Sequence, residues 1–387
     1  MDFSLSHEQE MIYHYGDNLL KEFGRDYWLD CAERRAFPTA MYKRVAEDGF
    51  VGIMVPEADG GAGLGMLEMV LLQEGLANAG IPLQSLVVGA TMSLGPIGKY
   101  GTAEQKQKYL PAGCVGDIRF CFAITEPDAG TNTMRTSTML TEDGSGGYKL
   151  NGRKTFITDA EGADYMLVVA RNAQLSEVER KTDGFTIAIV DTKAPGIEMH
   201  PIELSIPLPE KQYQLFFDDV SVGAGDILGE LGKGFNILFE SLNPERMILA
   251  AMCCGMGRYA MDRAVEYAND RVVFDGPIGA YQALQHPLAK GKTDIELASL
   301  MTRKAACLFD SQVACGEEAN MAKFGASTAA VNAIDASLQC FGGNGFTKEY
   351  GIFDLYPFAR LLKTAPLNNE MVLNFIAEKG MGLPRSY

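Results

Sequence analysis

The hydrophobic residues of this chain follow three successive spacings. Over residues 5–113 they recur every three or four positions, as in Met69, Leu72 and Leu76, which is the spacing of amphipathic helices. Over about 115–228 short runs rich in β-branched and aromatic residues, bounded by Gly, Asp and Pro, indicate strands. After Gly234 the helical spacing returns. The clearest strand runs are 165–170, 185–190 and 213–222, and the long helical segments are 235–270, 290–316 and 321–341.

This order of helices, strands and helices predicts an α+β protein with separate domains, because a chain that alternates strand and helix would show a different order. We expect an N-terminal helical domain over 1–114, a middle β-domain over 115–228 and a C-terminal helical domain over 229–387.

Composition narrows the class of protein. The chain has 387 residues, of which 47% are hydrophobic and 22% charged, as in globular proteins. Its net charge of −16 argues against a nucleic-acid surface, and no apolar run is long enough to cross a membrane or to form a signal peptide. Its eight cysteines include no CxxC pair and its four histidines no HExxH pair. We expect a cytoplasmic enzyme with no metal and no membrane or nucleic-acid partner.

Six segments carry the strongest signals in the sequence. They are 49–57 (GFVGIMVPE), 122–131 (FAITEPDAGT), 152–158 (GRKTFIT), 229–235 (GELGKGF), 271–274 (RVVF) followed by Gln282, and 339–346 (QCFGGNGF).

Together and in this order, the six segments resemble the acyl-CoA dehydrogenase family almost from end to end. The resemblance implies that family's fold, with an N-terminal helical domain, a middle antiparallel β-domain and a C-terminal four-helix bundle. It also implies FAD as cofactor, an acyl-CoA substrate, an electron-transferring flavoprotein as partner, and a homotetramer built as a dimer of dimers.

By the same resemblance, the middle segments hold the isoalloxazine ring, which needs hydrogen-bond donors at its edge and apolar groups at its faces. Thr125 bonds the pyrimidine edge, Thr158 donates to N5, and Phe122 and Phe156 flank the ring where relatives often have Tyr and Trp. The further cofactor positions implied are Ile124, Thr131, Arg271, Phe274, Gln282, Gln339 and Gly343.

Thr131 and the residue after Phe274 also differ from the usual pattern. Thr131 stands where the family usually has a Ser beside the substrate thioester, so it is also expected to contact substrate. The Arg271 guanidinium suits a diphosphate because it offers paired charged donors. Asp275 follows Phe274 where a Gly is usual, which changes the expected path of that loop.

The family removes an α-proton with a carboxylate, often a Glu near the C-terminus. The matching position here is Pro366, within 364–370 (TAPLNNE), so the usual base is absent. Members such as the isovaleryl-CoA and long-chain enzymes carry the base on another helix, in a Glu-Arg pair. This chain has LNPER over 242–246 at that place, so Glu245 is the expected base, with Asn243 and Arg246 as substrate contacts; Glu370 is a weaker candidate.

Pro366 also lacks the N–H that helps to hold the thioester oxygen in relatives. One alternative is that Pro366 lies in the first turn of a helix and Leu367 supplies the donor, and another is that the alignment is displaced by one residue. Otherwise one donor is lost, which would suit a reductase or an activated acid. The alternative functions are therefore an enoyl-CoA reductase of the crotonobetainyl-CoA type, an oxidase, and a catalytically silent CoA-binding protein. The sequence does not identify the acyl group of the substrate. Candidates for the residues that line its pocket are Leu86, Val88, Met92 and Leu94.

Overall fold

The computed structural model describes residues 4–386, and the chain divides into two compact units. The first combines the chain up to Tyr27 with Gly65–Leu83 and with everything from Asn243 onward, and the second contains Trp28–Leu64 and Gln84–Leu242. Helix α7 (Gly234–Asp270) contributes to both units, because their boundary lies inside it. Segments far apart in the sequence therefore fold together, whereas the domain boundaries at 114 and 228 remain predictions.

An eight-stranded sheet forms the centre of the second unit. Its spatial order is β6-β7-β3-β2-β4-β5-β8, and β1 adds to β4. The pairings are antiparallel, except that β1 and β2 each pair with β4 in parallel. The strands are β1 (Phe120–Ala123), β2 (Met139–Glu142), β3 (Tyr148–Thr158), β4 (Tyr165–Arg171), β5 (Phe185–Asp191), β6 (Ile197–Ile202), β7 (Gln212–Val222) and β8 (Ile227–Leu228).

Helices that precede the sheet in sequence also belong to this unit. They are α3 (Thr39–Glu47), a π-helix over Leu86–Leu94, α5 (Gly95–Tyr100) and α6 (Ala103–Cys114). Helix α6 is fixed to the sheet by the buried Gln105, whose side-chain amide donates to Gly225 O at 2.8 Å and to Ile227 O at 2.9 Å. The strand core is apolar, with Leu150, Met166 and Val168 fully buried.

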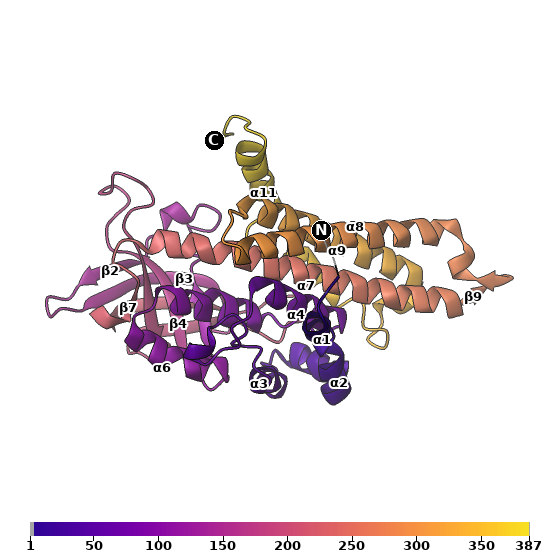
Figure 1. Cartoon of the computed structure of the whole chain (residues 1–387), viewed down its shortest axis with the longest axis horizontal. Coiled ribbons are helices and arrows are strands. Elements are labelled where there is room, and N and C mark those ends of the chain that lie inside the picture. Colours follow the sequence, from indigo (N-terminus) through magenta and orange to yellow (C-terminus); the bar gives the residue numbers. More distant parts are fainter. Residues whose placement is uncertain (1–3, 387) are drawn as a thin grey trace. The chain divides into compact units, whose positions relative to one another are not determined.

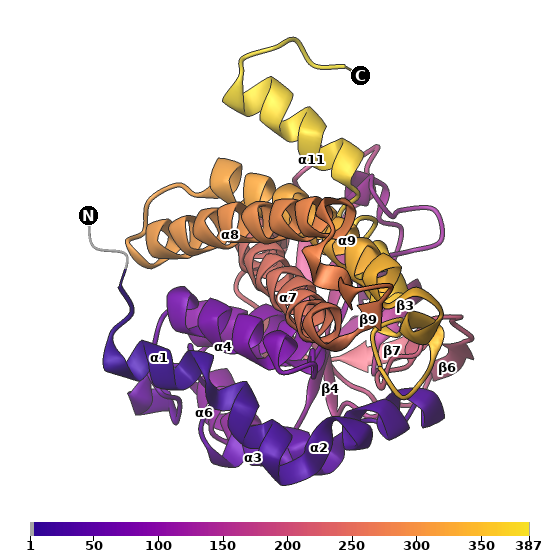
Figure 2. The ribbon, with the colours of Figure 1, turned by 90° about the vertical axis from the view of Figure 1, so that its right-hand side faces the viewer.

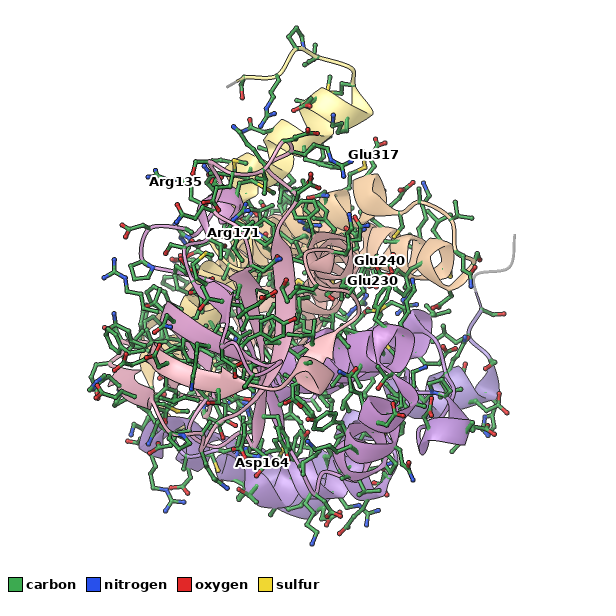
Figure 3. The ribbon with its side chains drawn as sticks, turned by 90° about the vertical axis from the view of Figure 1, so that its left-hand side faces the viewer. Arg135, Asp164, Arg171, Glu230, Glu240 and Glu317 are labelled. Carbon is green, nitrogen blue, oxygen red and sulfur yellow. The ribbon has the colours of Figure 1, made fainter. Side chains whose placement is uncertain are left out.

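Arg171, at the end of β4, organises the loops at that end of the sheet (Figure 3). Its guanidinium is buried over the Phe185 ring and donates to the carbonyl oxygens of Met134, Lys181 and Asp183 at 2.8–3.0 Å. The carbonyl of Met134 belongs to the short 3-10 helix Thr133–Arg135, which follows Thr131 closely. Arg171 therefore holds the segment that carries one of the predicted substrate contacts.

Long helices make up most of the first unit (Figures 1 and 2). Helix α7 packs against two of them at Gly257, where an added Cβ would lie 2.5 Å from Ile295 Cδ1 and 3.5 Å from Ala330 Cα. Only glycine permits so close an approach. The helices of this unit are α1 (His7–Tyr13), α4 (Met66–Asn78), α7 from Asn243, α8 (Gln282–Asp310), α9 (Gly316–Phe341), α10 (Leu355–Leu361) and α11 (Asn369–Phe375); α2 (Tyr15–Arg34) begins here.

Helix α4 lies inside the first unit with most of its side chains buried. Its Glu74 is fully buried and accepts hydrogen bonds from Ser299 Oγ at 3.0 Å, while the guanidiniums of Arg258 and Arg303 lie 3.1 Å and 3.5 Å from its carboxylate. These partners offset the cost of burying a charge. Over residues 4–386, no helix is both long and apolar enough to cross a membrane.

Candidate active site

The segment that follows β1 is fixed by a buried ion pair. Lys154 Nζ, on β3, donates to Ile124 O and to Glu126 Oε1, both at 2.9 Å, and Thr155 N–H donates to Thr125 O at 2.9 Å. Because both neighbours of Thr125 are held in this way, its backbone has a fixed position beside β3. The structure therefore brings together Ile124, Thr125 and the 152–158 segment, as the family resemblance requires.

Both members of this ion pair are charged at neutral pH. Burial opposes the ionisation of Glu126, but Lys154 and the hydrogen bonds from Thr138 and Ser137 outweigh it and lower the pKa of Glu126 to about 2. Burial lowers the pKa of Lys154 to about 8, against the attraction of Glu126. Such a pair is costly to break on one side, because the remaining charge stays buried without a partner.

Strand β3 changes register at the predicted flavin segment. A β-bulge between Lys154 and Ile157 leaves Phe156 with a positive φ of 56° and with 57% of its surface exposed. A bulky residue in this region of backbone space is rare, and exposing an aromatic ring adds an unfavourable contact with water. A displayed aromatic face of this kind fits the flat ring of a flavin.

The other predicted ring contacts have different environments. Phe122 is buried in the sheet, whereas Thr131 is exposed in the loop beyond it. Thr158 ends β3 and is buried, and its hydroxyl is paired with the side-chain amide of Gln212 on β7. The structure thus places the predicted N5 donor on a rigid strand rather than in a loop.

The first unit carries the residues predicted for the diphosphate and adenosine. A two-stranded hairpin, β9 (Val272–Val273) and β10 (Gly276–Pro277), joins α7 to α8 and turns at Phe274, which has a positive φ of 59° and is 89% exposed. Arg271 and Asp275 are exposed on the same hairpin. An exposed guanidinium beside a displayed ring suits a diphosphate joined to an aromatic base.

Gln282, Gln339 and Gly343 lie at the start of α8 and around the end of α9. Gln282 is the first residue of α8, and Gly343 is the second residue after α9, which ends at Phe341. A cavity of about 390 Å³ runs between the two helices, and its lining includes Gln339 and Ala283. The structure therefore brings the start of α8 and the end of α9 together, as the resemblance implies.

The predicted base, Glu245, lies on α7 in the first unit. Burial raises its pKa to about 7, against the attraction of Arg246 and Lys323. The guanidinium of Arg246 is buried and donates to Asn243 Oδ1 at 2.8 Å. The three predicted residues of the LNPER segment therefore form one local cluster, and its carboxyl group changes ionisation near neutral pH.

Lys323, on α9, joins this cluster to the chain around Pro366. Its Nζ donates to Lys363 O at 3.4 Å, to Leu367 O at 2.5 Å and to Asn369 Oδ1 at 2.7 Å, and burial lowers its pKa to about 8. Pro366 lies in the turn before α11, whose N-cap is Asn368. The first-turn explanation for Pro366 is therefore wrong, since the turn ends before the helix begins.

Sequence reasoning missed Lys154, Gln212 and Lys323. A signal existed for two of them. Arg153 and Lys154 are adjacent in a strand, so one of them must face the interior. Lys323 follows Ala319 by one helical turn on the buried face of α9. The role of Gln212 left no such signal, because it depends on its strand partner.

Comparison with known protein families agrees with this arrangement. The model for the acyl-CoA dehydrogenase N-terminal domain matches residues 6–117, that for the middle domain matches 121–220, and that for the C-terminal domain matches 232–381. The chain belongs to the acyl-CoA dehydrogenase family. The three-domain α+β fold expected from the sequence is thereby confirmed, and the protein is a flavin-dependent oxidoreductase that uses FAD, as the members of this family do.

Relatives within the family include both dehydrogenases and reductases. The chain is 41% identical to acyl-CoA dehydrogenase FadE12 of Mycobacterium tuberculosis, over 100% of this chain and 99% of the relative. It is 32% identical to CarC, a subunit of the caffeyl-CoA reductase-Etf complex of Acetobacterium woodii, over 88% and 89%. The solved butyryl-CoA dehydrogenase of Megasphaera elsdenii superposes with a TM-score of 0.90 at 29% identity, over 96% and 98%.

Proposed function

We propose that this family member catalyses the α,β-dehydrogenation of an acyl-CoA thioester, with Glu245 as the base that removes the α-proton. The observation that carries the proposal is the raised pKa of Glu245, a carboxyl group on α7. Burial raises this pKa to about 7. A base is most effective when its pKa lies near the working pH. The position that holds a carboxylate in many relatives is occupied by Pro366, which cannot take a proton.

The other residues of the site position the reactants. Bound FAD supplies the acceptor for the β-hydride, at N5 of its ring. Thr158 donates to that atom, Thr125 bonds the pyrimidine edge, and Phe156 covers the ring. Arg246 and Asn243 contact the pantetheine of the substrate.

Phe122, Ile124 and Thr131 complete the flavin site, and Thr131 also faces the thioester. Arg271, Phe274, Gln282, Gln339 and Gly343 bind the diphosphate and adenosine from a neighbouring subunit, within a homotetramer that is a dimer of dimers. The exposure of Arg271 and Phe274 supports this role, because a displayed cation and ring are available to a second chain.

The electrons pass to an electron-transferring flavoprotein, since relatives of this chain include a subunit of a reductase-Etf complex. We place the enzyme in the cytoplasm. Its eight cysteines form no disulfide and seven of them are buried, as suits a reducing compartment.

An anaerobic titration with a panel of saturated acyl-CoAs, followed by flavin absorbance, tests the proposal. We expect one acyl class to bleach the flavin in wild type and not in Glu245→Gln. The matched control is Glu266→Gln, which changes an exposed glutamate on the same helix, α7, and should bleach as wild type does. Bleaching that survives Glu245→Gln would move the base elsewhere.

The second candidate function is an enoyl-CoA reductase. One observation favours it: a relative of this chain belongs to a caffeyl-CoA reductase complex. In that case no saturated acyl-CoA bleaches the flavin, whereas an α,β-unsaturated acyl-CoA reoxidises the reduced enzyme. A chain that responds to neither class is a silent CoA-binding protein.

A further inference from the structure

Thr158 and Gln212 form an unusual hydrogen-bonded pair. They are opposite each other in the antiparallel register of β3 and β7, and only 8% and 7% of their surfaces are exposed. The Thr158 hydroxyl oxygen lies 3.0 Å from Gln212 Nε2 and 3.2 Å from Gln212 Oε1. Both ends of one amide are therefore within hydrogen-bond distance of the same hydroxyl group.

A hydroxyl group has one proton to donate and two lone pairs with which to accept. Beside this amide, Thr158 has two complete arrangements. It can accept from Nε2–H and donate its own proton outward, or it can donate to Oε1 and accept from a donor outside. The Thr158 hydroxyl lies within hydrogen-bond distance of both the nitrogen and the oxygen of the Gln212 amide. Thr158 can therefore adopt either arrangement without movement of the amide.

These arrangements match the two states of a flavin at N5. The oxidised ring presents N5 as an acceptor only, whereas the reduced ring carries a proton there and presents a donor. A threonine that faces N5 must therefore donate in one state and accept in the other. Without an amide beside it, its hydroxyl would lack a second partner in a buried site, which carries a free-energy cost.

We propose that Gln212 is a positioning residue that lets Thr158 reverse the direction of its hydrogen bond to N5 as the flavin changes redox state. The inference rests on the proposed role of Thr158 at N5 and deepens it. The strands hold the pair rigidly, because the next backbone bond, from Asp159 N–H to Lys211 O at 2.8 Å, closes the register beyond it. Gln212 acts only through Thr158 and does not touch the substrate.

A double-mutant cycle on the purified flavoprotein, without substrate, tests the proposal. The variants are Gln212→Met, which keeps the length of the side chain and removes both partners, Thr158→Val, and the two together. The readouts are the flavin absorbance spectrum and the two-electron midpoint potential. The matched control is Gln214→Met, a substitution of the same kind on the same strand, outside the Thr158 pair.

We expect Gln212→Met to change the ratio of reduced to oxidised flavin roughly two- to tenfold at a fixed potential, a shift of up to about 30 mV, with a change in the oxidised spectrum. In the Thr158→Val background the same substitution should have no further effect, and Gln214→Met should match wild type. Gln212→Asn, which withdraws the amide by one methylene, should reproduce the Gln212→Met result, and it replaces that variant if the latter does not fold.

Additive effects of Gln212→Met and Thr158→Val would overturn the inference, because additivity would mean that Gln212 does not act through Thr158. A wild-type potential and spectrum in Gln212→Met, or in Thr158→Val, would also overturn it. The readouts need no acyl-CoA, so failure of the proposed reaction is seen separately: the wild-type flavin then resists every acyl-CoA while the cycle still shows coupling.

Discussion

Replacing Glu245 by Gln should remove activity and raise stability at the same time. Burial raises the pKa of Glu245 from 4.5 to about 7 in the folded chain. A tenfold change in an acid dissociation constant corresponds to about 1.4 kcal/mol, so the ionised carboxylate costs the fold roughly 3 kcal/mol. Gln has a similar shape and cannot ionise, and it therefore avoids this cost.

The direction in which stability changes with pH follows from the difference in proton binding between the folded and unfolded chains. Between pH 4.5 and about 7 the folded chain holds the Glu245 proton and the unfolded chain does not, so the stability contributed by the protonated group is lost as the pH rises. The wild type and Glu245→Gln should therefore differ little at pH 4.5. Above pH 7 the variant should be more stable by roughly 3 kcal/mol.

Denaturant unfolding of both proteins across pH 4.5–7.5 measures this difference, in which the titration of groups that do not interact with Glu245 cancels. Glu266→Gln controls for the loss of one negative charge at an exposed site on α7 and should change stability by less than about 0.5 kcal/mol. A difference between wild type and Glu245→Gln that stays constant across the pH range would refute the reasoning. The same ionisation should make flavin reduction by substrate about tenfold slower per pH unit below 7.

Three further substitutions test other parts of the structure. Lys154→Met leaves the Glu126 carboxylate buried without its partner and should cost about 3–5 kcal/mol in denaturant unfolding, much of it recovered by adding Glu126→Gln. Phe156→Ala removes a half-exposed ring, so it should change stability by less than about 1 kcal/mol but sharply lower the fraction of FAD retained through gel filtration. Asn368→Ala removes the N-cap of α11 and should cost about 1 kcal/mol, seen as faster hydrogen exchange at the Met371 amide.

For each of these three predictions, one experimental outcome would contradict the reasoning. A small loss of stability in Lys154→Met would show that water reaches the ion pair. Full FAD retention in Phe156→Ala would remove Phe156 from the flavin site. Unchanged exchange at Met371 would mean that packing alone holds the first turn of α11.

Local patterns predicted most elements of the fold. The runs at 165–170 and 185–190 are β4 and β5, and the segments 235–270 and 321–341 are close to α7 and α9. Helix α8 spans Gln282–Asp310, whereas the predicted segment was 290–316. The pattern missed its first residues because a proline such as Pro287 disfavours a helix. Spacing along the chain gave the elements, but it could not give the parallel pairing of β1 with β4, which joins distant residues.

The site was predictable only where residue type and order carry information. The segments with Thr125, Thr158 and Glu245 could be named from the sequence, and their roles remain predictions. The supports of the site could not be found in this way. Lys323 donates hydrogen bonds to Lys363 and Leu367, which lie 40 and 44 residues further along the chain, so its role appears only when the fold brings these groups together.

The discontinuous first unit has a consequence for how the protein is made on the ribosome. Helix α4 carries the Glu74 carboxylate, and its cationic partners Arg258 and Arg303 belong to α7 and α8. At about 5–20 residues per second, translation from Leu83 to Asn243 takes roughly ten to thirty seconds. Throughout this interval α4 has α1 beside it but not its later partners α7 and α8, so the surface that these two helices will cover stays accessible to a chaperone.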